Sequence, residues 1–211
     1  NISGNWLAGG TFNINRIFGK NQNFTFDSNS SLNYHNSVDA AEVTTANDDA
    51  WQNVVESTVY NFNVGERLRL NWSRNGWHLG AKLQGNYTRA TSSRENFNVI
   101  NAVNHSYSAS ARIPLPWEFH FATDLTLYCR DGYNDEQLNT NELVWNARLE
   151  RSILNGNLTF ILDGFDILGN LSNVRHSINA QGITETYYNV VPAYGMLHIV
   201  YKLNIEPKKR K

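Results

Sequence analysis

Residues 58–88 read TVYNFNVGERLRLNWSRNGWHLGAKLQGNYT. From Thr58 to Trp72 the even positions are mainly apolar and the odd positions mainly polar, which is the period-2 pattern of a β-strand. Arg74-Asn75-Gly76 then provides residues that tolerate the positive φ angles of a tight hairpin turn. The apolar parity resumes on odd positions from Trp77 to Tyr87. The stretch therefore predicts two long antiparallel strands with one apolar face and one polar face.

The same alternation recurs along the whole chain. It predicts about nine strands, near residues 4–18, 24–35, 58–73, 77–88, 107–113, 117–129, 143–153, 158–162 and 194–204. Short turns follow the first, third, fifth and seventh strands. Long polar connections follow the others, at 39–52, 92–101, 131–140 and 166–191, and the last of these is predicted to hold a short hairpin around Gln181-Gly182.

Sorting of connections by length is typical of outer-membrane β-barrels, which have tight periplasmic turns at one rim and long loops at the other. The sequence therefore predicts an all-β, antiparallel, up-and-down transmembrane barrel over residues 1–204, followed by a basic tail over 205–211. Bacterial single-chain barrels have an even number of strands. With about nine, either another strand lies within 166–191 or the chain is the C-terminal portion of a larger barrel.

Composition agrees with this interpretation. The 211 residues carry a net charge of −1, so the chain has no overall positive potential that would attract nucleic acid. The basic run at 208–211 is expected to be a solvated terminus. No apolar run approaches the ~20 residues of a membrane-spanning helix, whereas alternation hides a lipid-facing strand from such a search. No signal peptide precedes the first strand, so we expect a processed chain or part of a longer one. Cys129 falls on the apolar parity and is expected to act as a small hydrophobe.

The polar face is the candidate functional surface, because in a barrel it would line the lumen. Each of its residues could contact water, a plug domain or a solute, although most are expected only to wet the interior. The lumen-facing candidates are Asn61, Asn63, Arg67, Arg69, Asn71, His78, Lys82, Gln84, Asn86, His120, Asp124 and Arg148.

The apolar face is expected to carry a lipid-facing aromatic belt. Its candidates are Trp72, Trp77, Tyr87, Trp117, Phe119, Trp145 and Tyr201. Arg16 and Arg151 share the apolar parity next to short turns, where they can extend to the membrane interface. Glu66 also falls on this face near mid-strand, where a charge is unfavourable, and beyond a bulge near Gly65 the sequence offers no reason for it.

No catalytic or metal-binding motif is present. The six histidines are scattered without metal-ligand spacing, and Asp131, Asp135 and Glu136 lack a calcium-loop pattern, so no cofactor, metal or enzymatic activity is expected.

Four segments together resemble the strands and turns of TonB-dependent-receptor-like outer-membrane proteins of Gram-negative bacteria. They are LVWNARL at 143–149, FDILGN at 165–170, YGMLHIVY at 194–201 and the turn PLPWEF at 114–119. The resemblance implies a 22-stranded barrel in the outer membrane, in contact with lipid and closed by an N-terminal plug. It also implies import of a solute with energy passed from TonB. The plug and the remaining strands would be contributed by sequence outside this stretch.

Two alternatives remain open at the level of sequence. One is a self-contained barrel of about ten strands with a structural or adhesive role, which requires the first strand to pair with the last. The other is an outer-membrane enzyme, which requires Asp131, Asp135, His105 and His176 to converge.

Overall fold

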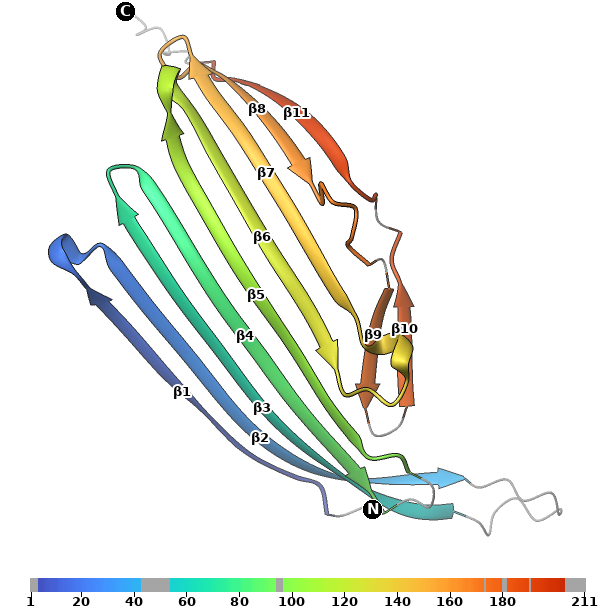
Figure 1. Cartoon of the computed structure of the whole chain (residues 1–211). Helices are drawn as coiled ribbons and strands as arrows, with labels where there is room; N and C mark the ends of the chain where they lie inside the picture. The colour runs from blue at the N-terminus through green and yellow to red at the C-terminus, as the bar shows by residue number, and fades with distance from the viewer. Residues whose placement is uncertain are drawn as a thin grey trace, which may run out of the picture.

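The chain forms one antiparallel sheet of nine strands and a separate two-stranded hairpin (Figure 1). The computed structural model describes residues 4–42, 54–93, 97–172, 174–179, 182–189 and 191–203. Neighbours in the main sheet follow chain order, β1-β2-β3-β4-β5-β6-β7-β8-β11, so the sheet is a meander. The strands are β1 (Trp6–Phe18), β2 (Phe24–Glu42), β3 (Val54–Arg74), β4 (Trp77–Ser92), β5 (Ile100–Leu115), β6 (Phe119–Asp131), β7 (Asn141–Ile153), β8 (Leu158–Phe165) and β11 (Tyr194–Tyr201). The nine-stranded, all-β antiparallel prediction is confirmed.

The β3–β4 hairpin has the register that its sequence predicts. Trp72 pairs with Leu79 and Arg69 with Lys82, so apolar residues meet apolar residues and polar residues meet polar ones. The turn between the strands places Asn75 at φ 50° and Gly76 at φ 81°. Both angles lie in the left-handed region that two-residue hairpin turns require. A one-residue slip would turn every side chain to the other face, so this alternation fixes the register.

The other short turns use similar local chemistry. A 3-10 turn, η1 (Lys20–Gln22), joins β1 to β2, and Leu154, Asn155 and Gly156 with positive φ join β7 to β8. A third, η2 (Pro116–Glu118), joins β5 to β6. The sequence-based placement of Trp117 on a strand is wrong: Trp117 lies in η2 at φ 60° and is 79 % exposed. The strand begins only at Phe119, because Pro116 interrupts the extended chain.

The long connections lie at the opposite end of the sheet. Among them, η3 (Glu136–Leu138) sits in the β6–β7 loop, and β9 (Val174–Asn179) pairs with β10 (Gly182–Tyr187) as the expected hairpin. β2 continues to Glu42 and so extends into the segment predicted as the loop 39–52, whereas β3 begins at Val54, just after that segment. The remainder of that loop, and the basic tail at 205–211, lie outside the described residues.

The main sheet does not close on itself. β1 and β11 are its two edges, and β9 and β10 pair with each other rather than with either edge. The strand that a self-contained barrel would need within 166–191 is therefore not part of this sheet in the described residues. No helix in those residues has the length and apolarity to cross a membrane.

The short turns climb steadily across the sheet, as the steps at the top of Figure 1 show. One row of directly paired residues can be followed across the sheet from the first turn. It starts at Phe18 and Phe24 and includes Trp72 on β3, Ala111 on β5 and Ala147 on β7. Arg74 ends β3 two residues beyond Trp72, Leu115 ends β5 four beyond Ala111, and Ile153 ends β7 six beyond Ala147. Each hairpin is thus shifted by the same two residues, or one residue per strand.

Large apolar side chains remain exposed on the sheet. The buried hydrophobic residues that the structure describes are few: Val59, Ala90, Ala102, Cys129, Leu138 and Val144. By contrast, Leu70, Leu79, Leu83 and Leu125 are 40–47 % exposed. Cys129 is a buried free cysteine on the apolar face, the face that its parity predicted. A sheet this poor in buried apolar residues presents an apolar face that nothing within the described part of the chain covers.

Candidate functional site

All twelve lumen-facing candidates lie on one face of the sheet, which we call the polar face. In the cross-strand register this face carries Arg69 and Lys82 on β3 and β4, and Asp124 and Arg148 on β6 and β7. The other face, which we call the apolar face, carries Trp72, Leu79, Ala111 and their partners. The structure thus brings together on one surface residues that are up to 87 positions apart in the sequence, from Asn61 to Arg148.

Four cations form the centre of the polar face. Arg67 and Arg69 lie on β3, Lys82 on β4 and Arg112 on β5, and we call this set the cationic strip. On the polar face of these three strands, from Val59 to Pro114, every other residue is uncharged apart from His78, and none is acidic. On the polar face of the flanking strands, the acidic residues are Asp27, opposite Arg69, and Asp39, opposite Ser57, on β2, and Asp124, opposite Ser110, on β6.

The polar face is hollowed beside this strip. One hollow of about 520 Å³ spans β3 to β8, and a second of about 240 Å³ adjoins it. Asn71, Gly80 and Ser110 line both hollows. The Ser110 hydroxyl and the Asn71 side-chain oxygen lie over Gly80, 2.6 and 3.1 Å from where a Cβ would stand, so the floor is rich in hydrogen-bonding groups. Side chains that reach the hollows include Arg69, Lys82, Arg112, His78, Asp124 and Asn146.

A charged cluster borders the larger hollow near the β8–β11 edge. Arg148 donates to Asp163 through Nε at 2.6 Å and through a terminal nitrogen at 3.0 Å, in a bidentate contact. His198 Nε2 lies 3.1 Å from the Oδ2 atom of the same carboxylate. Asp163 is only 3 % exposed, and the bidentate contact with the Arg148 guanidinium offsets the cost of burying its carboxylate. Arg148 was a sequence candidate, whereas Asp163 and His198 were missed.

The missed pairing has a signal in the sequence. Arg148 lies five residues before Ile153 and Asp163 five residues after Leu158, the two residues that flank the β7–β8 turn. Equal spacing from a hairpin turn places residues opposite each other, and the structure pairs them.

The aromatic candidates occupy the apolar face in two rows. The row at the short turns contains Phe18, Phe24, Trp72, Trp77, Phe119, Phe160 and Tyr201. The second row lies eight to ten residues further along the strands and contains Tyr34, Tyr87, Tyr107 and Trp145. Trp117 belongs to neither row, because it lies in η2. Arg151, near the short turns, places its guanidinium 4.9 Å from the Phe119 ring centre.

Glu66 has a structural explanation on this face. Its carboxylate accepts hydrogen bonds from the Ser28 hydroxyl at 2.9 Å and from the Ser30 hydroxyl on the neighbouring strand. Glu66 lies eight residues before Arg74, level with the second aromatic row. In the other direction β3 continues for 12 residues toward the long connections. The carboxylate therefore lies level with the second aromatic row and has two hydrogen-bond donors. The bulge proposed near Gly65 is wrong, since the β2–β3 pairing is uninterrupted there.

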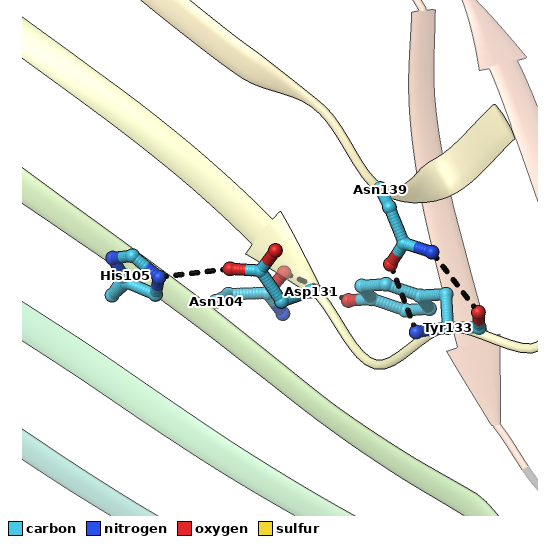
Figure 2. A network of polar contacts seen from close by, with 5 residues as sticks. All are labelled: Asn104, His105, Asp131, Tyr133 and Asn139. Atoms are coloured by element: carbon cyan, nitrogen blue, oxygen red, sulfur yellow. Dashed lines mark hydrogen bonds and ion pairs between the residues drawn. The ribbon is translucent and has the colours of Figure 1, made fainter. Parts of the chain in front are cut away.

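A small polar network lies at the end of β5 and β6 (Figure 2). His105 Nε2 is 3.0 Å from Asp131 Oδ2, and Tyr133 donates to Asn104 at 2.8 Å. Asn139 both accepts from the Tyr133 backbone N–H and donates to its carbonyl, which closes the loop.

Only part of the cluster that an enzyme would require is assembled. His105 and Asp131 meet, but Asp135 caps η3 by accepting from the Gln137 backbone N–H. The side chain of His176 lies outside the described residues. Within the described part of the chain, no three His, Cys, Asp or Glu residues are grouped so that they could hold a metal ion.

Comparisons with known proteins add no relative. No protein-family model matches the sequence, and neither a curated protein nor a solved structure matches it at a significant level.

Proposed function

We propose that this chain forms membrane-spanning strands of an outer-membrane β-barrel, with the polar face lining a lumen that binds and imports a solute. The observation that carries the proposal is the pair of aromatic rows on the apolar face. Eight to ten residues of strand separate them, which for tilted strands is roughly 22–27 Å of height. The apolar band of a membrane barrel, flanked by its two aromatic girdles, is about 25 Å tall.

The strand stagger supports the same proposal. A shift of one residue per strand moves each strand about 3.3 Å along its neighbour, and neighbours lie about 4.8 Å apart. If the short turns lie at one rim of a barrel, this shift means that the strands tilt by roughly 35° from the barrel axis. Membrane barrels have strand tilts of about 35–45°. A sheet continued with this stagger would therefore close with ordinary barrel geometry.

The open edges favour a larger barrel over a self-contained one. β1 exposes a 13-residue edge, and unpaired edges of this length are sites of uncontrolled association unless other strands cover them. We propose that further strands cover β1 and β11, and that a plug and TonB act with the complete barrel, as the resemblance implies. A self-contained barrel would need β1 to meet β11, which lie at opposite edges of the sheet.

The cationic strip indicates the class of solute. Arg69 and Lys82 line the smaller hollow without an acidic residue. In the larger hollow, by contrast, Asp124 and Asp163 balance Arg112 and Arg148. The positive potential is therefore concentrated at the smaller hollow, which is rich in hydroxyl and amide groups. Such a surface favours a small anionic solute that also bears hydroxyls. The His105–Asp131 pair lies on the apolar face, away from these hollows. It therefore supports an enzymatic function less than the cationic strip supports solute binding.

Two measurements on the protein as the cell makes it test the proposal separately. Fractionation should find it in the outer membrane, and its absence there would contradict the barrel. Titration of the purified protein should show tighter binding of glucose 6-phosphate than of glucose, with the difference reduced in Arg69→Gln. Equal binding of the two probes would contradict the proposal of an anionic solute and would not affect the proposal of an outer-membrane barrel.

A further inference from the structure

A third hollow, with a different lining, lies on the apolar face near the long connections. Its volume is about 420 Å³, and it is lined by Tyr34, Tyr60, Phe62, Arg89 and Thr91. The register explains why these residues meet: Tyr34 pairs with Phe62, Phe62 with Arg89, and Tyr60 with Thr91. We call this site the aromatic hollow. None of its residues belongs to the polar face.

Two further aromatic residues extend the walls of the hollow. Trp6 on β1 packs against Tyr34 with ring centres 5.0 Å apart, and Tyr87 meets Phe62 edge to face at 6.4 Å. Trp6 is 49 % exposed and Tyr60 39 % exposed. Several aromatic faces thus remain available on a surface that also carries a cation.

Arg89 has no anionic partner among the described residues. It is exposed, and no described carboxylate lies within ion-pair distance of it. An unpaired guanidinium on the apolar face is unusual, because a charged side chain on the lipid-facing side of a membrane barrel lowers its stability. It becomes favourable where an external anion lies, and guanidinium binds phosphate through two parallel hydrogen bonds.

The height of Arg89 fits a lipid headgroup. Arg89 lies 12 residues from Trp77 along β4 and two residues beyond Tyr87 of the second aromatic row. With the tilt derived above, it stands roughly 32 Å above the short turns, just beyond the ~25 Å apolar band. Below it, Leu32, Val64 and Leu83 are 36–51 % exposed on the same face. Acyl chains could lie along these side chains while the headgroup stays in the hollow.

We propose that the aromatic hollow binds the phosphorylated sugar headgroup of an outer-leaflet glycolipid. Arg89 would hold the phosphate, and Tyr60 and Phe62 would pack against the apolar faces of the sugar ring. The inference rests on the membrane placement given under Proposed function. It goes beyond that function because it assigns a specific lipid to the outside of the barrel.

The experiment uses the purified protein in vesicles of phosphatidylethanolamine and phosphatidylglycerol, with or without diphosphoryl lipid A. Retained lipid A is quantified by native mass spectrometry after extraction. We expect selective retention over phosphatidylglycerol and a reduction of about tenfold in apparent affinity for Arg89→Gln. Monophosphoryl lipid A should bind more weakly. Arg89→Lys should restore part of the affinity, because it keeps the charge but not the paired donors.

A matched control separates this site from general attraction to charge. Arg16→Gln removes a cation from the same face at the opposite edge of the apolar band, and it should leave lipid A binding unchanged. Equal binding by the wild type and Arg89→Gln would overturn the proposal, as would displacement of the lipid by millimolar inorganic phosphate, which would indicate a simple anion site. Failure of the wild type to enter vesicles would instead contradict the proposed barrel.

Discussion

Arg69 on β3 and Lys82 on β4 are directly paired across the polar face. Like charges in opposite positions of an antiparallel pair destabilise a sheet. The Asp27 carboxylate, which accepts a hydrogen bond from Asn15, faces Arg69 from β2 and offsets part of this repulsion. Local rules are most often violated where function requires it, and the proposed anionic solute supplies that requirement.

Removing one charge of this pair should separate stability from binding. We expect Lys82→Gln to raise the free energy of unfolding by about 0.2–1 kcal/mol, because it relieves the repulsion. It should at the same time weaken the binding of glucose 6-phosphate. Denaturant unfolding and titration measure the two effects. A variant that loses both stability and binding would show that Lys82 is structural. Gln84→Ala, also on the polar face of β4, serves as the uncharged control.

The Arg148–Asp163–His198 cluster should behave as one unit. Arg148→Met leaves a carboxylate that is 3 % exposed with His198 as its remaining base, so we expect a loss of about 2–4 kcal/mol in unfolding free energy. Asp163→Asn should cost less, because Arg148 is 48 % exposed and can be hydrated. A double-mutant cycle measures the coupling. Additive effects of the two substitutions would contradict the pairing.

The Glu66 carboxylate should depend on its two serine donors. Ser30→Ala removes one donor, and we expect a cost of about 1 kcal/mol in unfolding free energy while Glu66 is present. In a Glu66→Leu background the same substitution should cost close to nothing, since no carboxylate remains to be satisfied. If Ser30→Ala has the same effect in both backgrounds, the hydrogen bond does not explain Glu66.

Glycine positions provide a test of the central hairpin. Gly76 lies at φ 81°, where an added Cβ is strained, so Gly76→Ala should lower stability by about 1–2 kcal/mol. Gly85, on the apolar face of β4, lacks a positive φ, and a Cβ added there would meet no atom within 4 Å. Gly85→Ala is therefore the matched control and should be neutral or stabilising. Equal losses would argue against the turn described here.

Local pattern was sufficient for much of the fold. Alternation between Thr58 and Thr88 predicted the β3–β4 hairpin, because a half-exposed strand shows its face directly in the sequence. The same signal misplaced Trp117, since aromatic parity continued into a turn that Pro116 begins. Asp163 and His198 were missed because their roles come from cross-strand contacts with Arg148 rather than from any local motif.

The unusual positions became interpretable only with the register. Glu66 lies near the middle of β3, as the sequence indicated, but the serine donors on β2 that satisfy its carboxylate were not predicted. Arg89 was not singled out at all, because its surroundings come from three strands. The aromatic hollow around it depends on Tyr34, which lies 55 positions earlier in the chain.

The most direct test of the account is the lipid exposure of adjacent residues on one strand. Single cysteines at Leu68, Arg69, Leu70 and Asn71, in a Cys129→Ala background, would be spin-labelled in the membrane-embedded protein. Collision with oxygen and with a water-soluble nickel complex would then be compared. The account predicts strict alternation, with oxygen access highest at positions 68 and 70 and nickel access highest at 69 and 71. Equal access to the nickel complex at all four positions would contradict it.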